Sequence, residues 1–294
     1  MLVSSVEEGI GEVVANPYKK DGKVLVGKTT KVSSLKEAIL DSVNVIGGFN
    51  KVVEKGDEIL LKPNFNTPDP PPSSSDPEFV KATIELLYEH GAKKVILGES
   101  AMLRLSTRNV LKKAGMLKKA EESGAEIIIF DEGKWKRVET GGTYLKNVSL
   151  PETALKSKKV VYTCCMKTHR FAKFTFSLKL AVGFMKPRER MRLHMRHLEE
   201  KIVDLNLVVH PNLIIMDGRK CFVSGRPASG ELRTPGLVLA SGDRIAMDIE
   251  ALRTVAAFDG SSLKNDPWSY TQIRRAVQLG LGERNEQDYE VVTS

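Results

Sequence analysis

Short apolar runs alternate with amphipathic segments along most of the chain. Continuous apolar runs that end in polar residues predict buried strands at 57–64, 93–100, 125–133, 158–166, 212–218 and 236–241. Periodic apolar positions predict helices after the cap Asp76 with Pro77 in first position, and at 106–125 with a break near Gly115, 151–157, 173–186, 190–209, 243–260 and 268–280. The polar stretch 134–150 predicts a hairpin, and the Pro- and Ser-rich stretch 66–76 predicts a mobile loop.

The alternation of strands and helices predicts an α/β fold. A mostly parallel sheet with helices on both faces is the architecture that such an order favours. We expect two α/β lobes with a cleft between them, although one continuous domain is the alternative. The expected boundaries are an N-terminal extension at 1–22, a first lobe at 23–133 and a second lobe at 134–294.

Polar residues follow the predicted strands. Sites in parallel sheets form at the carboxyl edge, where the strands end. We therefore expect side chains distant in sequence to meet there, from the strand ends Lys62-Pro63-Asn64, Glu99-Ser100, Asp131-Glu132, Lys167-Thr168-His169, Asp217-Gly218 and Ser241-Gly242-Asp243.

Positive charge is concentrated in one segment. The chain of 294 residues has a formal net charge of +8, and between Lys156 and Lys201 it carries 13 Lys and Arg against three Glu. This local excess of +10 leaves the other residues at about −2. Such a field attracts phosphates, carboxylates or nucleic acid, although a solvated cationic face is the commoner explanation of a charge run.

Composition excludes several classes of protein. Hydrophobic content of 41% and charged content of 28% are typical of globular domains, and no apolar run approaches the roughly 20 residues that span a bilayer. The first residues lack a signal peptide's basic and apolar regions, so we expect a cytoplasmic protein with no membrane partner. The three cysteines form no CxxC pair, and Cys164 and Cys165 continue an apolar run as small buried hydrophobes.

Lys167, His169 and Lys179 are candidate reactive residues. Lys167 and His169 follow a buried strand and are expected at the carboxyl edge of the sheet. Lys179 has apolar neighbours, and their desolvation would lower its pKa, which is the condition for a lysine base or nucleophile. The alternative is that Lys179 extends to solvent from an amphipathic helix.

His194 and His197 are spaced three residues apart, which would place both on one face of the predicted helix. With His169 they could bind a divalent or transition metal, although histidines on basic helices more often meet solvent. The neighbouring guanidinium groups match carboxylate and phosphate oxygens, and they belong to Arg188, Arg190, Arg192 and Arg196.

The glycine-rich segment 217–236 follows a predicted strand. It could cradle an anion, and Asp217 could hold a cation or orient a histidine, while a surface loop explains the segment about as well. Asp248 lies in a predicted helix that could point toward the same edge, although acids near a helix start are routine. The chain lacks the phosphate-binding loop, the dinucleotide fingerprint and the serine-hydrolase and zincin motifs.

A nucleic-acid interpretation depends on residues 167–197. Phe171, Phe174 and Phe176 alternate with cations there, as single-strand binding requires, but their spacing fits a packed helix equally well. An interaction surface for an acidic protein is a further alternative.

Several segments together resemble the uncharacterised family catalogued as domain of unknown function 362. They are GDEILLKPNFN, GAKKVILGES, MKTH, FSLKLAVGF, IIMDG and SGDRIAMDIEAL, in order over roughly 23–282. The matching family positions are Lys62, Asn64, Lys167, His169, Lys179 and Asp217, whereas Leu180 stands where the family usually has Asn. Many members carry ferredoxin-like cysteine motifs that hold iron–sulfur clusters; this chain has none, so we expect no such cluster.

The spacing of His169, Lys179 and His194 is also similar to that of the nickel-pincer lactate racemases. The resemblance implies that Lys179 tethers or contacts a cofactor and that the two histidines act as metal ligands or acid–base groups.

The favoured hypothesis is a protein that holds a small carboxylate or phosphate at the carboxyl edge of the sheet; whether it is an enzyme is left open. His169, Lys179 and His194 would be catalytic, and Asp217 and His194 would be metal ligands. Lys62, Asn64, Lys167 and Arg190 would bind substrate. The hypothesis predicts that Lys62, His169, Lys179, His194 and Asp217 converge on one pocket.

Overall fold

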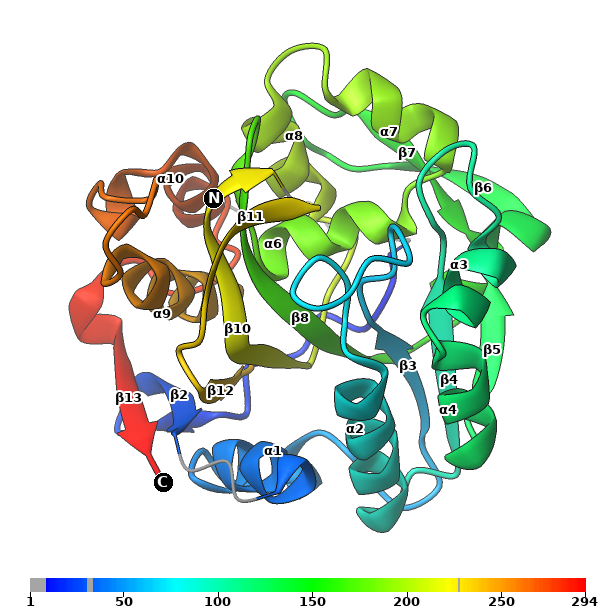
Figure 1. The fold of residues 1–294 in the computed structure, drawn as a ribbon, viewed down its shortest axis with the longest axis horizontal. Helices are drawn as coiled ribbons and strands as arrows, with labels where there is room; N and C mark the ends of the chain where they lie inside the picture. The colour runs from blue at the N-terminus through cyan, green and yellow to red at the C-terminus, as the bar shows by residue number, and fades with distance from the viewer. Residues whose placement is uncertain (1–8, 31–33, 227) are drawn as a thin grey trace.

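The computed structural model describes residues 9–30, 34–226 and 228–294. Residues 1–8 of the expected N-terminal extension lie outside this range. A large mixed sheet crosses the molecule (Figure 1), with the strand order β1-β2-β12-β10-β8-β3-β4-β5. The strands on this path are β1 (Lys19–Lys20), β2 (Lys23–Thr29), β3 (Glu58–Lys62), β4 (Lys94–Glu99), β5 (Glu126–Ile129), β8 (Lys159–His169), β10 (Leu213–Arg226) and β12 (Leu237–Ser241).

The centre of this sheet is parallel. β10, β8, β3, β4 and β5 run in one direction, whereas β12 is antiparallel to both β10 and β2. Three shorter strands extend it: β9 (Lys173–Thr175) on β8, β11 (Ser229–Arg233) on β10, and β13 (Tyr289–Thr293) on β2. The predicted α/β fold with a mostly parallel sheet is confirmed.

Helices cover both faces of the sheet because successive side chains of each strand point to opposite sides. Ile59 and Leu61 join one apolar core, and Leu60 joins the other. The first core is closed by α1 (Leu35–Asn44), α2 (Pro77–Glu89), α3 (Thr107–Lys113) and α4 (Met116–Glu122). The second is closed mainly by α6 (Ser177–Leu180), α8 (Leu198–Leu205), α9 (Arg244–Ala256) and α10 (Thr271–Gln278).

The predicted helix start at Asp76, the break at Gly115 and the hairpin at 134–150 are all present in the structure. Asp76 accepts a hydrogen bond from the Glu78 amide at the start of α2, where Pro77 takes the first position. Gly115 adopts φ 82° and separates α3 from α4, because glycine enters the left-handed region without a steric penalty. The expected hairpin is a separate antiparallel pair, β6 (Trp135–Glu139) and β7 (Asn147–Pro151), followed by the short α5 (Glu152–Leu155).

Two helix predictions are wrong in their extent. Residues 173–186 form β9, then α6, then a 3-10 turn at Ala181–Phe184, because Lys167–His169 pair antiparallel with Lys173–Thr175. Residues 190–209 form two helices, α7 (Pro187–Leu193) and α8, since His197 takes a left-handed conformation with φ 53° between them.

Two segments expected to be loops are ordered by specific pairing. The segment 217–236 continues β10 and returns as β11, because Cys221 and Val223 remain buried and keep the chain in the sheet. In the segment 66–76, the Ser74 hydroxyl donates to the Thr67 carbonyl oxygen at 2.6 Å, and the Ser75 amide donates to the Asn64 carbonyl oxygen at 2.8 Å.

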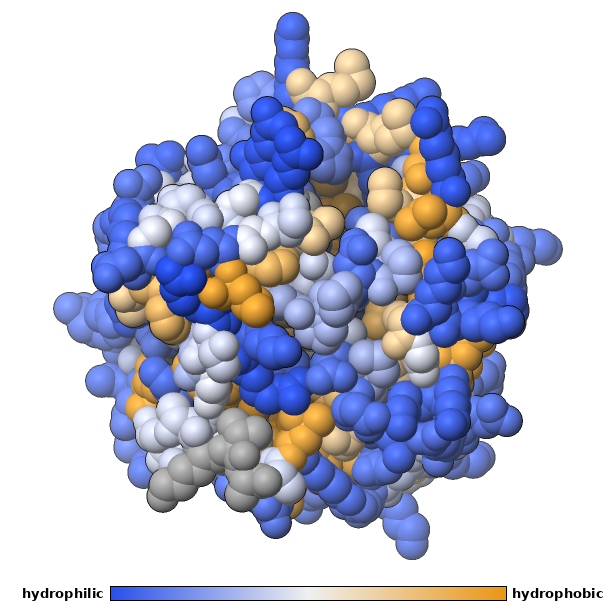
Figure 2. Space-filling model, in the orientation of Figure 1, coloured by the Kyte–Doolittle hydropathy of each residue, from blue (hydrophilic) through white to orange (hydrophobic). Residues whose placement is uncertain are grey.

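Two separate lobes are not confirmed. Strands from 23–133 and from 134–294 share one sheet: β8 pairs with β3, and β2 pairs with β12 and β13. The described part of the extension also packs on the body, since Ile10 is fully buried and its amide donates to the Val208 carbonyl oxygen. Figure 2 shows that hydrophilic side chains cover most of the viewed face, with apolar surface exposed in patches between them.

Candidate functional site

The strand order reverses between β3 and β8. From β3 the chain moves outward through β4 to β5, and it then returns to place β8 on the opposite side of β3. In parallel sheets this reversal leaves a crevice outside the carboxyl ends of the two strands. A cavity of about 450 Å³ lies there, and its lining includes residues at the ends of β3, β4 and β8.

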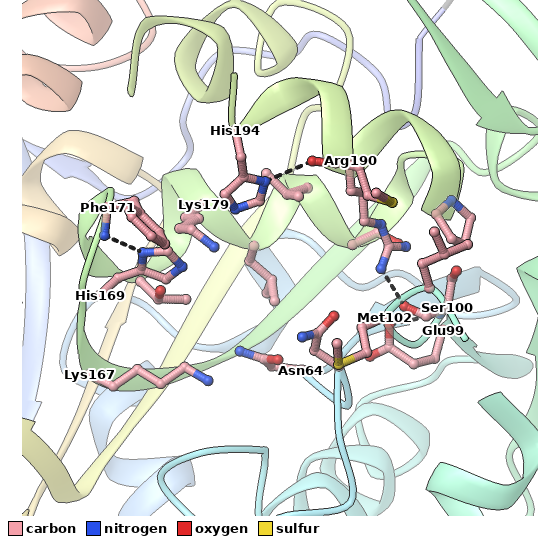
Figure 3. Close-up of a pocket in the computed structure, with 18 of the residues that line it drawn as sticks. Asn64, Glu99, Ser100, Met102, Lys167, His169, Phe171, Lys179, Arg190 and His194 are labelled. Carbon is pink, nitrogen blue, oxygen red and sulfur yellow. Dashed lines mark hydrogen bonds between the residues drawn. The ribbon is translucent and has the colours of Figure 1, made fainter. Parts of the chain in front are cut away.

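Seven of the eight predicted site residues line this cavity. They are Lys62, Asn64, Lys167, His169, Lys179, Arg190 and His194. Figure 3 shows Lys167, His169, Lys179 and His194 around one space, with Asn64, Glu99 and Arg190 along its other side. Residues separated by more than a hundred positions therefore meet because β3, β8, α6 and α7 end or begin at this edge.

Lys62 and Glu99 form a buried ion pair in the wall of the cavity. The Lys62 Nζ donates to Glu99 Oε1 at 2.6 Å and to the Pro63 carbonyl oxygen at 2.7 Å, and both side chains are almost fully buried. Burial lowers the pKa of Lys62, and the Glu99 carboxylate opposes that shift. Glu99 also accepts from the Phe65 and Ser100 amides, so its charge is fully engaged.

Lys179 is an amine without a counter-ion. Within the described ranges it makes no hydrogen bond or ion pair, and burial together with the cations Lys167 and Arg190 lowers its pKa to about 7. The prediction that apolar surroundings desolvate this lysine is consistent with its position on α6 between the buried Leu178 and Leu180. Near neutral pH a substantial fraction of the Lys179 side chains therefore carries a free lone pair.

His169 and His194 have opposite hydrogen-bonding roles. His169 Nδ1 accepts from the amides of Phe171 at 3.2 Å and Ala172 at 3.1 Å, so its hydrogen lies on Nε2. Burial, Lys179 and His194 lower the pKa of His169 to about 2, which keeps the ring neutral. His194 Nδ1 lies 2.7 Å from the Arg190 carbonyl oxygen, which can only accept, so the lone pair of the neutral His194 ring lies on Nε2.

Arg190 is mainly a structural clamp. Its guanidinium donates to the carbonyl oxygens of Met185, Ser100, Ala101 and Gly183 at 2.8–3.2 Å. A guanidinium has five N–H groups, so little of its donor capacity is left for a ligand. Burial lowers the pKa of Arg190 to about 10.

Asp217 lies outside this cavity, and the prediction that it joins the others is wrong. The parallel register places Asp217 beside Cys165, and its carboxylate accepts from the Arg219 guanidinium at 2.7 and 2.8 Å. Asp217 lines a second hollow, of about 590 Å³, where Arg219 also binds Asp76. Asp217 and His194 thus do not face a common metal site.

The predicted histidine pair does not form either. The His197 ring packs at a tilt against Tyr144, with 4.9 Å between ring centroids. His194 faces the cavity, and its ring centroid lies 6.3 Å from that of His169. In the described ranges, no cluster of three or more His, Cys, Asp or Glu side chains is arranged to hold a metal ion. Of the roles implied by the pincer resemblance, Lys179 and His194 present suitable atoms, whereas the Nε2 hydrogen of His169 does not suit a metal ligand.

Sequence reasoning missed several lining residues. Thr175, Gly183 and Arg226 lay in segments taken for helices or a loop. A Cβ on Gly183 would stand 2.6 Å from Lys62 Cε, so glycine is needed for the Lys62 side chain to pass. The Phe-rich pattern was only partly informative, since Phe174 and Phe176 are buried and Phe171 is 63% exposed.

Comparison with known proteins supports the relationship suggested by the motifs. A thylakoid-associated protein of Synechocystis sp. is 26% identical over 237 residues, which cover 78% of this chain and 72% of that protein. No helix in the described ranges is long and apolar enough to cross a bilayer. A cytoplasmic location stays a prediction.

The family model described as Domain of unknown function (DUF362) matches residues 59–253, from β3 to α9, and the chain belongs to this family.

Proposed function

We propose that the cavity binds a small carboxylate or phosphate and that Lys179 and the two histidines perform acid–base chemistry on it. One observation carries the proposal: apart from Lys179, five basic side chains and a single carboxylate line the cavity, and that carboxylate is paired with Lys62. These five side chains belong to Lys62, Lys167, Arg170, Arg190 and Arg226. Their excess charge favours an anion.

Hydrogen-bond donors with spare capacity surround the space. Lys167 donates to the Ser73 carbonyl oxygen, which leaves two of its ammonium hydrogens, and His169 Nε2–H has no acceptor among the described residues. The buried hydroxyls of Ser100 and Thr175 also lack partners there. Because unpaired buried polar groups are costly, an anionic ligand or ordered water would relieve this cost.

The two rings support different steps. His169 can donate from Nε2 to an oxyanion, as neutral imidazoles do when they polarise a carbonyl. His194 can accept a proton at Nε2, and uncharged Lys179 can act as a second base. Metal assistance is a separate proposal, in which His194 Nε2 would be a ligand; elemental analysis of protein purified without a metal-affinity tag would test it.

Calorimetric titration with oxalate and inorganic phosphate tests the proposal. We expect saturable binding of at least one anion and roughly 10- to 100-fold weaker binding in Lys167→Met, because a charged hydrogen-bond donor is lost. Lys173→Met removes the same charge from an exposed position outside the cavity and should bind normally. No saturable binding, or equal weakening in both variants, would count against the proposal.

Nucleic-acid binding is the second candidate. Arg170, Arg188, Arg192 and Arg196 are exposed, and the Arg170 guanidinium lies over the exposed Phe171 ring at 5.4 Å from its centroid. Binding of this kind should weaken steeply as salt rises, because phosphate contacts release counterions. Retention of single-stranded RNA that does not change with salt would argue against it.

A further inference from the structure

Lys179 has the properties of a nucleophile as well as those of a base. Its ammonium has no carboxylate partner in the described part of the chain, and burial and the charges of Lys167 and Arg190 disfavour its protonation. A lysine that is desolvated beside other cations can attack a carbonyl carbon, because its lone pair is free near neutral pH.

The groups around Lys179 match the needs of that attack. His169 offers an N–H to a carbonyl oxygen, and His194 offers a lone pair to a departing proton. The two rings lie 6.3 Å apart between centroids, so one small molecule can contact both. Figure 3 shows the Lys179 side chain directed into the space that these rings border.

We propose that Lys179 forms a Schiff base with a small 2-oxo acid held in this cavity. The inference rests on the proposed function and names its substrate class. Carboxylate and carbonyl groups would be adjacent in the substrate because the Lys179 amine and the anion-binding Lys167 line the same part of the cavity. Both lie close enough to His169 to lower its pKa. Inorganic phosphate lacks the carbonyl carbon that the amine requires.

The reaction balances without an oxidant or reductant. The Lys179 lone pair forms a bond to the carbonyl carbon, and the π pair moves to oxygen, where His169 Nε2–H stabilises it. His194 Nε2 takes a proton from nitrogen and returns it to that oxygen, giving a carbinolamine. The second amine proton leaves with the hydroxyl as water, and a C=N bond forms.

Reductive trapping tests the inference. The probes are glyoxylate and pyruvate with sodium cyanoborohydride at pH 7.5, analysed by intact mass and peptide mapping. We expect one adduct per chain with at least one probe, mapped to Lys179, slowed by oxalate and absent from Lys179→Met. Lys173→Met, an exposed-lysine control on the neighbouring strand β9, should react like the wild type.

The outcomes separate this inference from the proposed function. If oxalate binds and Lys167→Met weakens that binding, but neither probe labels Lys179, the Schiff-base proposal is wrong and the anion-binding proposal stands. If no anion binds and no adduct forms, both fail. Labelling spread over many lysines also overturns the inference. Mapping is done on the wild-type protein, so the result does not depend on whether Lys179→Met folds.

Discussion

His169 and His194 carry the same side chain but present different atoms to the cavity. The difference comes from Nδ1, which accepts backbone N–H groups in His169 and faces the Arg190 carbonyl in His194. The partners lie within four residues of each ring, but the contacts form only when a turn or helix end brings the backbone to Nδ1, and residue type alone does not specify that geometry. Their distinct chemical roles follow from these contacts.

At the same scale, Lys179 should make stability depend on pH. Its pKa is about 7 in the folded protein and near 10.5 when unfolded, so above pH 7 the unfolded state binds more protons and wild-type stability rises with pH. Below pH 7 both states are protonated, and the burial cost is complete. The free energy of unfolding of Lys179→Met minus that of the wild type should therefore be largest at pH 6 and about 2–3 kcal/mol smaller at pH 9.

Urea denaturation at both pH values measures this change. Lys173→Met is the control, since this exposed lysine lies outside the cavity and should show no comparable pH-dependent difference. A stability difference for Lys179→Met that is the same at pH 6 and pH 9 would show that the lysine is not desolvated.

At the scale of elements, α6 is too short to hold Lys179 in place by itself. Its start is fixed by the buried Asp248 of α9, whose carboxylate accepts from the Ser177 amide at 2.8 Å, the Ser177 hydroxyl at 2.6 Å and the Leu178 amide at 3.2 Å. Burial raises the pKa of Asp248 to about 7, while these donors oppose the shift. For Asp248 the sequence left open a place near the sheet edge or a routine role near a helix start. In the structure it positions the element that carries the candidate nucleophile.

Asp248→Ala should lower the free energy of unfolding by about 2–4 kcal/mol, since it leaves buried donors without an acceptor. Asp248→Asn keeps one acceptor oxygen and should cost less. Denaturant titration measures both, with the exposed Asp259→Ala as the matched control. Equal stabilities for Asp248→Ala and Asp259→Ala would remove Asp248 from this role.

At the scale of the whole molecule, one sheet joins both halves of the chain. Leu61 on β3 packs in the same core as Val161 on β8, and β3 lies between β8 and β4. A substitution that destabilises residues 23–133 should therefore also destabilise residues 134–294.

Leu61→Ala should lower the free energy of unfolding by about 2–5 kcal/mol. Both tryptophans, Trp135 and Trp268, lie in 134–294, so their fluorescence reports on the other half. We expect their transition to shift together with the loss of helical circular dichroism. A tryptophan transition that stays at the wild-type midpoint would indicate two independently stable lobes.

The sequence was sufficient for features that depend on neighbouring residues. Strand ends, the Asp76 cap and the Gly115 break follow from local apolar runs, capping chemistry and glycine's conformational freedom. The rule that parallel strands present their carboxyl ends at one edge predicts that Lys62, Lys167 and His169 lie together, and all three line the cavity.

Tertiary structure alone decided what depends on strand order, register and non-local pairing. Periodicity could not show that Lys173–Thr175 would pair with β8 instead of continuing a helix, or that β3 and β8 would lie side by side in one sheet. Register places Asp217 beside Cys165, four residues before His169 along β8, where it binds Arg219 outside the cavity, although Asp217 follows an apolar run just as His169 does. Residue types and their spacing thus determined which groups reach the sheet edge, while packing determined which of them meet and which hydrogen atoms they carry.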